Sequence, residues 1–502
     1  MADAEDKAQS EQQAKAVEVT AREGLIESMI ANFETTAAGL SPDVREVTRD
    51  LIGFLRERMK TVKVDVALIN NIMSELDTLI GSQLDEILHH EKFQKLESAW
   101  TGLYWLITRT DFKENIRVEL LCASKKDLQQ DFEEAAGDVT TSGLFEHIYR
   151  SQYGAPNGKP YGAMVVNYEF NHHAPDMALL SDLAKVSAMA HAPVISAVGP
   201  ELFGPKGYEH LTDPKYSVVE AFAGKEHAKW NSFREDQNSM YVGLTLPHFL
   251  LRLPYNRKDN PVDEKEFRYE ERIAGKHNNY LWGNSAFAFA SRLTEAFKKW
   301  RWCWRIVGEQ SGGAIDDLKL HVFEQNGEMV QKPPTEVALA LDREFQLSEA
   351  GLIPLMWMRE KDQSVIYGAS SVRKPKKYPD TEEGNKKERD DKLRSRLPYI
   401  FILTRFAHYL KRIQTTYIGK PVTAGTIKRE LEEWIRQYVN NVDDPQPGTL
   451  GKQPLKNYSI NVQEDPKSPG VFLCDIKLTP HTLAEGFTAT LSLVTRQELG
   501  KK

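Results

Sequence analysis

The sequence predicts a mixed α and β protein of the α/β class. An N-terminal arm and a helical layer are expected to precede a central α/β domain and a C-terminal α+β domain with antiparallel terminal strands. Amphipathic helix patterns dominate before residue 110, strand and helix patterns alternate between residues 116 and 199, and strand patterns follow residue 457. Because 502 residues exceed one ordinary core, the length predicts two or three domains. We expect three, covering residues 1–60, 61–310 and 311–502.

The composition, with 41% hydrophobic and 27% charged residues, is typical of a soluble globular protein. A formal net charge of −7 argues against a nucleic-acid partner. No apolar run reaches the roughly 20 residues that a membrane-spanning helix needs. The acidic, glutamine-rich start also lacks an apolar signal segment. We therefore expect a cytoplasmic protein that does not insert into a membrane.

Residues 1 to about 24 form a polar arm with one β-friendly patch, at Val17, Val19 and Thr20. A short extended patch on such an arm is suited to adding a strand to an exposed sheet edge of another molecule.

The helical layer follows this arm. Its helices are expected to begin at Ser41, near Val66, and at Ser82, where Asp85 completes a candidate capping box. The last helix of the layer has an apolar face made of Leu96, Trp100, Leu103 and Ile107.

Strand and helix patterns alternate in the central region. Strands are expected over residues 116–123, 162–170 and 193–199, and a helix over residues 177–189. Such alternation predicts a largely buried sheet. It also leaves one alternative function open, an α/β enzyme with its site at the carboxyl ends of these strands.

An aromatic block follows between Tyr280 and Trp304. Its apolar residues recur at helical spacing from Ala286 to Trp300 and then alternate through Trp302, Trp304 and Ile306. The pattern predicts a helix that runs into a strand, with the tryptophans buried as a structural centre.

The charged stretch from Val372 to Arg396 has almost no apolar residues and is expected to be a solvated loop. A buried helix over Leu397–Ile413 and an amphipathic helix over Thr426–Val442 are expected after it. The polar face of the second helix carries Lys428, Arg429, Glu432, Glu433 and Arg436. This face can contact another protein or simply face water, and the sequence leaves both interpretations open.

The C-terminal region has strand patterns over Tyr458–Glu464, Val471–Leu478 and residues 486–494, separated by turns rich in proline and glycine. The first two strands are expected to pair as a wide hairpin.

Motifs for catalysis or cofactor binding are incomplete. The loop Gly308–Gly313 has the glycine spacing of a phosphate-binding loop, but Ala314 and Ile315 replace the lysine and the hydroxyl residue that it needs. Ser285 lies in an incomplete nucleophile elbow, and its better interpretation is a helix start. The histidine pairs at residues 89–90 and 172–173, and the three distant cysteines, lack metal-ligand spacing. We expect no catalytic residue, cofactor or metal site, and hence a structural or assembly role.

Several long segments together resemble the large subunit of the contractile sheath of type VI secretion, the TssC/VipB family. These segments are HHEKFQKLESAWTGLYWLI (residues 89–107), residues 188–203, LPHFLLRLPY (246–255), LWGNSAFAFASRLTEAFKKWRW (281–302), GEQSGGAI (308–315) and SRLPYIFILTRFAHYLK (395–411). The likeness covers the chain from about Ile26 to its C-terminus, in the order of the family.

The resemblance implies a non-enzymatic building block. Its partners would be a small sheath subunit of the TssB/VipA type, further copies of itself in a helical sheath, a hexameric inner-tube protein of the Hcp type and a baseplate. An AAA+ ATPase of the ClpV type would disassemble the contracted sheath through the small subunit.

The resemblance also implies strand exchange between neighbouring subunits. In this sequence the implied strands carry Val17, Val19 and Thr20 in the arm, and Tyr458, Ile460, Val462, Val471, Leu473 and Ile476 near the C-terminus.

Overall fold

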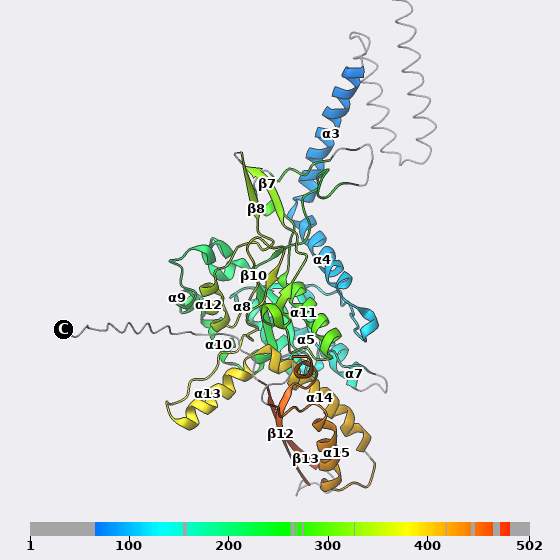
Figure 1. Cartoon of the computed structure of the whole chain (residues 1–502), viewed down its shortest axis with the longest axis vertical. Coiled ribbons are helices and arrows are strands. Elements are labelled where there is room, and N and C mark those ends of the chain that lie inside the picture. The colour runs from blue at the N-terminus through cyan, green and yellow to red at the C-terminus, as the bar shows by residue number, and fades with distance from the viewer. Residues whose placement is uncertain are drawn as a thin grey trace, which may run out of the picture. The chain divides into compact units, whose positions relative to one another are not determined.

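A computed structural model describes residues 66–153, 158–262, 267, 269–273, 276–325, 327–417, 419–442, 447–464 and 472–481 (Figure 1). The chain divides into two compact units. One comprises Met1–Leu88 with Tyr255–Arg272, and the other comprises His89–Pro254 with Ile273–Lys502. The predicted helix at Ser41, the patch at residues 17–20 and the predicted strand at residues 486–494 lie outside the described residues.

In the first unit, α3 (Val66–Leu88) is one continuous helix. The helix start predicted at Ser82 is therefore wrong. Ser82 lies inside α3, and its hydroxyl donates to the Thr78 carbonyl at 2.8 Å instead of capping a helix. Asp85 is likewise no capping residue. Its carboxylate accepts hydrogen bonds from the Tyr269 hydroxyl at 2.7 Å and from the Arg272 backbone N–H at 3.2 Å.

The second unit is built on a parallel sheet of four strands in the order β1 (Met164–Phe170), β2 (Val194–Val198), β3 (Val242–Leu246) and β9 (Ile353–Pro354). The strands predicted within residues 162–170 and 193–199 are thereby confirmed. The helix between them is α8 (Ala174–Ala190), which confirms the helix predicted over residues 177–189. All residues of β2 and β3 are buried, as expected for a sheet covered on both faces.

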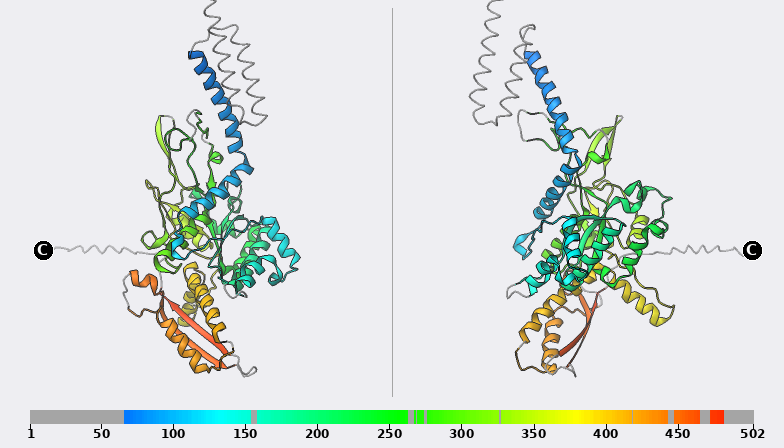
Figure 2. Two further views of the ribbon diagram at one scale, coloured as in Figure 1. Left: turned by 90° about the vertical axis from the view of Figure 1, so that its right-hand side faces the viewer. Right: turned by 180° about the vertical axis from the view of Figure 1, so that it is seen from behind.

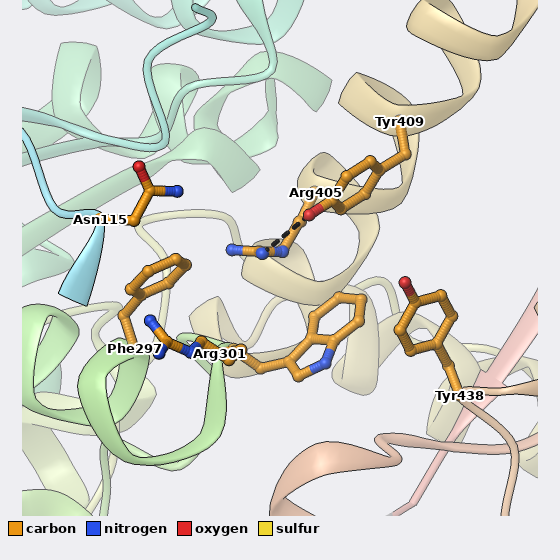
Figure 3. A pocket seen from close by; sticks show the side chains of 7 residues that line it. Asn115, Phe297, Arg301, Arg405, Tyr409 and Tyr438 are labelled. Atoms are coloured by element: carbon orange, nitrogen blue, oxygen red, sulfur yellow. Dashed lines mark hydrogen bonds between the residues drawn. The ribbon is translucent and has the colours of Figure 1, made fainter.

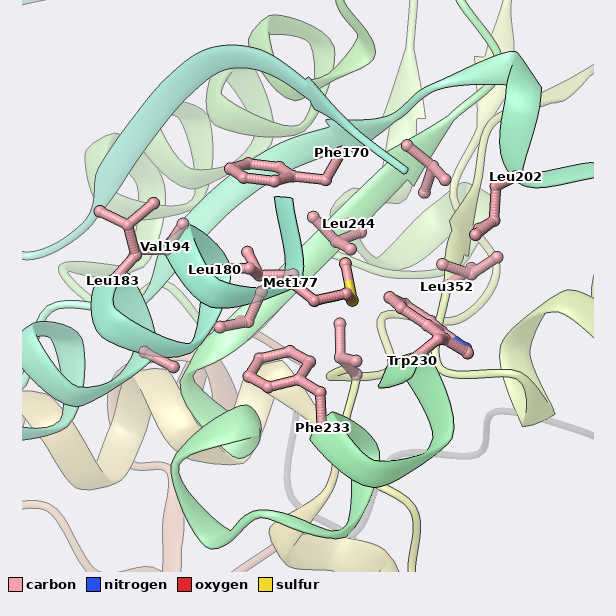
Figure 4. Packing of buried hydrophobic residues seen from close by; sticks show 14 of the residues in the cluster. Phe170, Met177, Leu180, Leu183, Val194, Leu202, Trp230, Phe233, Leu244 and Leu352 are labelled. Carbon is pink, nitrogen blue, oxygen red and sulfur yellow. The ribbon is translucent and has the colours of Figure 1, made fainter. Parts of the chain in front are cut away.

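Helices cover both faces of this sheet. On one face, Val194 belongs to a core that includes α8 and α10 (Ala228–Glu235), with Met177, Leu180 and Trp230 packed together (Figure 4). On the other face, Ile195 belongs to a core that includes α11 (Ser285–Trp300) and the first turns of α14 (Leu397–Tyr417).

The strand predicted over residues 116–123 is wrong. This segment lacks regular secondary structure, and within the described residues no strand pairs with it. Its apolar side chains at Val118, Leu120 and Leu121 are exposed. An alternating apolar pattern needs a neighbouring strand to become a sheet, and here that neighbour is missing from the described chain.

In the aromatic block, the predicted helix is confirmed and the predicted strand is not. Helix α11 ends at Trp300, which confirms the helix, but the strand after it is wrong. Arg301 adopts left-handed backbone geometry with φ of 66°, and its N–H caps α11 by donating to the Phe297 carbonyl at 2.8 Å. The chain therefore turns instead of extending. Trp302 and Trp304 are nevertheless buried, as the alternation predicted.

A C-terminal layer packs around these tryptophans. It contains α14, α15 (Ala424–Arg436) and an antiparallel hairpin of β12 (Leu455–Glu464) and β13 (Phe472–Pro480). Figure 2 shows the hairpin lying along the helices of this layer. The hairpin and the buried helix starting at Leu397 are thus both confirmed.

The charged stretch before α14 is not the solvated loop that was expected. It contains α13 (Glu382–Arg394), which the Thr381 side chain caps. Helix-favouring ion pairs at i, i+4 spacing join Glu383 to Lys387 and Glu388 to Lys392. The stretch is also anchored to the fold, because a buried ion pair of 2.6 Å links Arg373 to Asp391.

Among the described residues, the other α-helices are α4 (Glu91–Thr108), α5 (Lys125–Glu134), α6 (Gly143–Phe145), α7 (Ser151–Tyr153), α9 (Val218–Phe222), α12 (Leu341–Glu349) and α16 (Pro447–Lys452). The remaining strands are β4 (Phe249–Leu250), β5 (Trp282–Gly283), β6 (Ala314–Ile315), β7 (His321–Gln325), β8 (Glu328–Lys332), β10 (Met356–Trp357) and β11 (Ser364–Val365).

Candidate protein-interaction site

The β12–β13 hairpin is long, and within the described residues it forms a sheet of its own two strands. Its register runs from Leu455 opposite Pro480 to Glu464 opposite Phe472. Among the described residues, the only bridge to either outer edge is between Val439 and Leu455, at the start of β12. Unpaired N–H and C=O groups along such edges are a template for a further strand.

The two faces of the hairpin differ. One face carries the predicted residues Tyr458, Ile460, Val462 and Ile476, and it packs into the core formed with α14 and α15. Leu473 lies on the other face, where its side chain is 57% exposed. Four of the predicted side chains therefore hold the hairpin to its own subunit. Another molecule could pair with the backbone edges of the hairpin. Val471 and the predicted residues of the arm, Val17, Val19 and Thr20, lie outside the described residues.

Helix α15 presents the charged face that the sequence predicts. Lys428, Arg429, Glu433 and Arg436 are exposed and Glu432 is half-buried, while Ile427, Leu431 and Ile435 point into the core. The helix spans Ala424–Arg436, so it begins two residues earlier and ends six residues earlier than predicted. Its capping residue is Thr423, not Thr426. The Thr423 hydroxyl oxygen accepts from the Thr426 N–H at 3.2 Å.

Helix α4 leaves an apolar stripe uncovered. Its inner side packs Trp105 edge-on against Phe249, with ring centroids 5.0 Å apart, and Gly102 allows the Phe287 ring to approach closely. The opposite side exposes an apolar stripe at helical spacing, which we call the α4 stripe. It consists of Phe93, Leu96, Trp100, Tyr104 and Ile107.

The exposure of the α4 stripe is unusual for a helix in a folded unit, since Trp100 is 58% and Tyr104 68% exposed. The sequence predicted an apolar face here, but three of its four residues, Leu96, Trp100 and Ile107, are exposed. Large exposed apolar patches mark surfaces that bind other proteins.

A partly buried ionic cluster lies inside the second unit, where the side chains of His248 and Glu336 are 13% and 16% exposed and that of Glu169 is 44% exposed. His248, which follows β3, contacts Glu336 Oε2 through Nδ1 at 2.6 Å and Glu169 Oε1 through Nε2 at 2.8 Å. His277 Nε2 contacts the other oxygen of Glu336 at 3.1 Å. We call this group the His248 cluster.

The His248 cluster holds a fixed positive charge between carboxylates. Burial alone would lower the pKa of His248, but the hydrogen bonds and charges of Glu169 and Glu336 outweigh burial and raise it to about 10. Burial likewise would raise the pKa of Glu336, yet its bonds to His248 and His277 lower it to about 2. With both ring nitrogens engaged by carboxylates, His248 is arranged as an ionic link between β1 and the chain before α12.

The motifs tested for catalysis occupy structural positions. Ser285 is buried at the start of α11 and donates to the Thr245 hydroxyl at 2.9 Å. His90 caps α4 by accepting from the Lys92 N–H at 3.3 Å. In the described part of the chain, no group of three or more His, Cys, Asp or Glu side chains is placed to hold a metal ion. None of the helices described is both long and apolar enough to cross a membrane.

Two family models of tail sheath domains match the chain. The family model VipB, described as EvpB/VC_A0108, tail sheath N-terminal domain, matches residues 70–373. A second model, described as EvpB/VC_A0108, tail sheath gpW/gp25-like domain, matches residues 386–497. The chain is also 36% identical over 481 residues to the type VI secretion system sheath protein TssC1 of Pseudomonas aeruginosa, covering 94% of this chain and 95% of that protein. The chain therefore belongs to the VipB/TssC family of type VI secretion sheath proteins.

Among solved structures, the chain is similar to the helical sheath of the anti-feeding prophage in its contracted state. That match has 9% sequence identity and a TM-score of 0.29, and it covers 64% of this chain and 68% of the other.

Proposed function

We propose that this chain is the large subunit of a contractile sheath in the bacterial cytoplasm. With a small sheath subunit it would form a helical tube around an inner tube of hexameric protein, attached to a baseplate. Contraction would drive the inner tube outward, and an AAA+ ATPase would act on the contracted sheath through the small subunit. The observation that carries the proposal is the match over nearly the whole length to the Pseudomonas sheath protein.

We infer a purely structural role with no catalytic activity. The His248 cluster supports this inference, because its histidine is held as a cation by two carboxylates and is thereby unsuited to act as a general base.

Strand exchange would join the subunits. Apart from the bridge between Val439 and Leu455, no strand is paired with the outer edges of β12 and β13 within the described residues. The arm patch at Val17, Val19 and Thr20 has the composition of an added strand. The charged face of α15, with Lys428, Arg429, Glu432, Glu433 and Arg436, would then contact the inner tube or an adjacent subunit.

The arm provides the test of this function. Deleting residues 1–24 is expected to leave a complex of large and small subunits intact but to abolish long tubes, because the subunits lose the strand that links them. The measurement is co-expression with the small subunit, followed by size-exclusion chromatography and electron microscopy. Tubes of normal length from the deleted chain would refute strand exchange. Globular particles alone from the full-length pair, under all conditions tried, would refute the sheath function.

The α4 stripe is our proposed docking surface for the small subunit. Trp100→Gln is expected to weaken the complex about 30-fold or more, since a buried tryptophan at an interface typically contributes about 2 kcal/mol or more. The free energy of unfolding should change by only about 0.5 kcal/mol, because Trp100 is exposed in the isolated chain.

Co-purification with a tagged small subunit and urea titration would measure these two effects. Phe345→Gln on α12 is a matched control, because Phe345 is an exposed aromatic residue on another helix. Equal recovery of the Trp100 and Phe345 variants would contradict the assignment of the α4 stripe.

A further inference from the structure

A pocket of about 410 Å³ opens where the end of α11, the middle of α14 and the turn after α15 meet (Figure 3). Its wall combines aromatic rings with cationic and amide groups. The lining residues are Asn115, Phe297, Arg301, Trp302, Arg405, Tyr409 and Tyr438. Figure 3 shows the guanidinium of Arg405 projecting into the centre of this ring of side chains.

Arg405 is held in a stack of aromatic rings. Its guanidinium carbon lies 4.8 Å from the ring centre of Phe297, 5.1 Å from that of Trp302 and 5.3 Å from that of Tyr409. Its Nη2 donates to the Tyr409 hydroxyl at 2.9 Å. These contacts fix the position of the charge without neutralising it.

The charge of Arg405 has no acidic counterpart in the described chain. No carboxylate there forms an ion pair with it, and its Nε–H is buried without an acceptor. Arg301, the other arginine of the pocket, differs in this respect. Its guanidinium is paired with the carboxylate of Glu114 and also donates to the Glu114 backbone carbonyl at 2.7 Å. A half-buried cation without a counter-charge is costly in free energy.

We propose that this pocket binds the carboxylate of an aspartate or glutamate side chain from a neighbouring sheath subunit. A carboxylate is the planar anion that a guanidinium binds through two parallel hydrogen bonds, and the aromatic walls would cover the methylene groups behind it. This inference rests on the proposed function, because a sheath places other subunits against this surface. Asp and Glu together outnumber Lys and Arg in this chain, 72 to 65, so acidic side chains are abundant on its copies.

The first test removes the charge. Arg405→Gln is expected to raise the protein concentration needed for half-maximal tube formation about tenfold or more, because a charge-assisted hydrogen bond is lost. Arg389→Gln on α13 is the matched control, since Arg389 is exposed and does not line this pocket. Tube formation by the Arg405 variant at the wild-type concentration would overturn the proposal.

A second variant tests the pocket without altering Arg405, whose replacement could disturb the aromatic stack and the fold. Asn115→Asp places a carboxylate at the exposed rim of the pocket, outside the buried core. The new charge should compete with the incoming carboxylate and weaken tube formation, while the melting temperature stays that of the wild type. Unchanged assembly of this variant would count against the proposal.

Photo-crosslinking would identify what enters the pocket. A benzoyl-phenylalanine at Tyr409 keeps an aromatic ring at the pocket wall, and mass spectrometry of assembled tubes would locate the attached peptide. We expect a peptide from another sheath subunit that contains an acidic residue. Replacing that residue with its amide should add nothing to the defect of Arg405→Gln. Crosslinks confined to the same chain, or additive defects, would overturn the proposal.

A free acid is the alternative occupant, and calorimetry with sodium 3-phenylpropionate tests it. The proposal would be overturned if the acid binds saturably to the wild type, if Arg405→Gln abolishes this binding, and if the same variant still forms tubes normally. The pocket would then bind a small-molecule acid instead of a protein carboxylate. Failure of the sheath function would appear separately, as the absence of tubes from the wild-type pair.

Discussion

A Glu336→Gln variant is expected to lose up to about 3 kcal/mol of the free energy of unfolding near neutral pH, because it leaves the mostly buried charge of His248 with the half-exposed Glu169 as its carboxylate partner. Glu336 is mostly buried and contacts His248 at 2.6 Å and His277 at 3.1 Å. After the substitution, the His248 imidazolium keeps only Glu169. Urea titration of the full chain, alone and in complex with the small subunit, would measure the loss.

The pH dependence of this loss follows from the two pKa values. The pKa of His248 rises from 6.5 to about 10 on folding, so its stabilisation is complete below pH 6.5 and declines as the pH rises toward 10. The pKa of Glu336 falls from 4.5 to about 2, so its stabilisation is complete above pH 4.5 and declines toward pH 2. The cluster should therefore stabilise the fold most between pH 4.5 and 6.5.

The control for this experiment is Glu328→Gln, which removes an exposed carboxylate from the same part of the chain. It should unfold like the wild type across the pH range. If Glu336→Gln instead keeps the wild-type dependence of stability on pH, the cluster does not carry the charge that its geometry indicates.

Trp304→Ala is expected to lower the free energy of unfolding by about 3–5 kcal/mol, because it leaves a large cavity in the C-terminal layer. Trp304 is fully buried, and its indole N–H donates to the Gly451 carbonyl at 3.2 Å. Its core also holds Phe406, Ile435 and Ile460, so the loss should reach both helices and the hairpin.

Comparison with Trp100→Ala would show that burial, and not the loss of a tryptophan as such, causes the effect. Trp100 is exposed, and its truncation should change the free energy of unfolding by only about 0.5 kcal/mol. Trp304→Phe keeps most of the volume and should fall between the two. Equal stability of the Trp304→Ala and Trp100→Ala variants would contradict the assigned core.

Elements were predicted correctly where they pack against elements that are adjacent to them in the sequence. Strand β1, helix α8 and strand β2 follow one another and pack together, so periodicity sufficed. Residues 116–123 have an equally good strand pattern, but within the described residues no strand lies beside them. Helix α13 was missed because it has almost no apolar period. Its cap at Thr381 and its Glu–Lys pairs were the signals that could have revealed it.

Some of the candidate interaction surfaces could likewise be predicted from the sequence and others could not. Alternation predicted the β12–β13 hairpin, and helical spacing predicted the charged face of α15. The α4 stripe was visible as an apolar face, but periodicity cannot say whether a face is covered by its own chain. The His248 cluster was not predicted, because His248 is 79 residues from Glu169 and 88 from Glu336 and only the fold brings them together.

The length of the β12–β13 hairpin has a mechanical consequence. Hydrogen bonds between antiparallel strands run perpendicular to the strand axis. A force along that axis therefore shears the hydrogen bonds between Leu455–Glu464 and Phe472–Pro480 together instead of opening them one after another. Any strand added to an edge of this hairpin would share that geometry. Subunits joined in this way would resist tension along the strands, because all the hydrogen bonds between the paired strands would bear the load together.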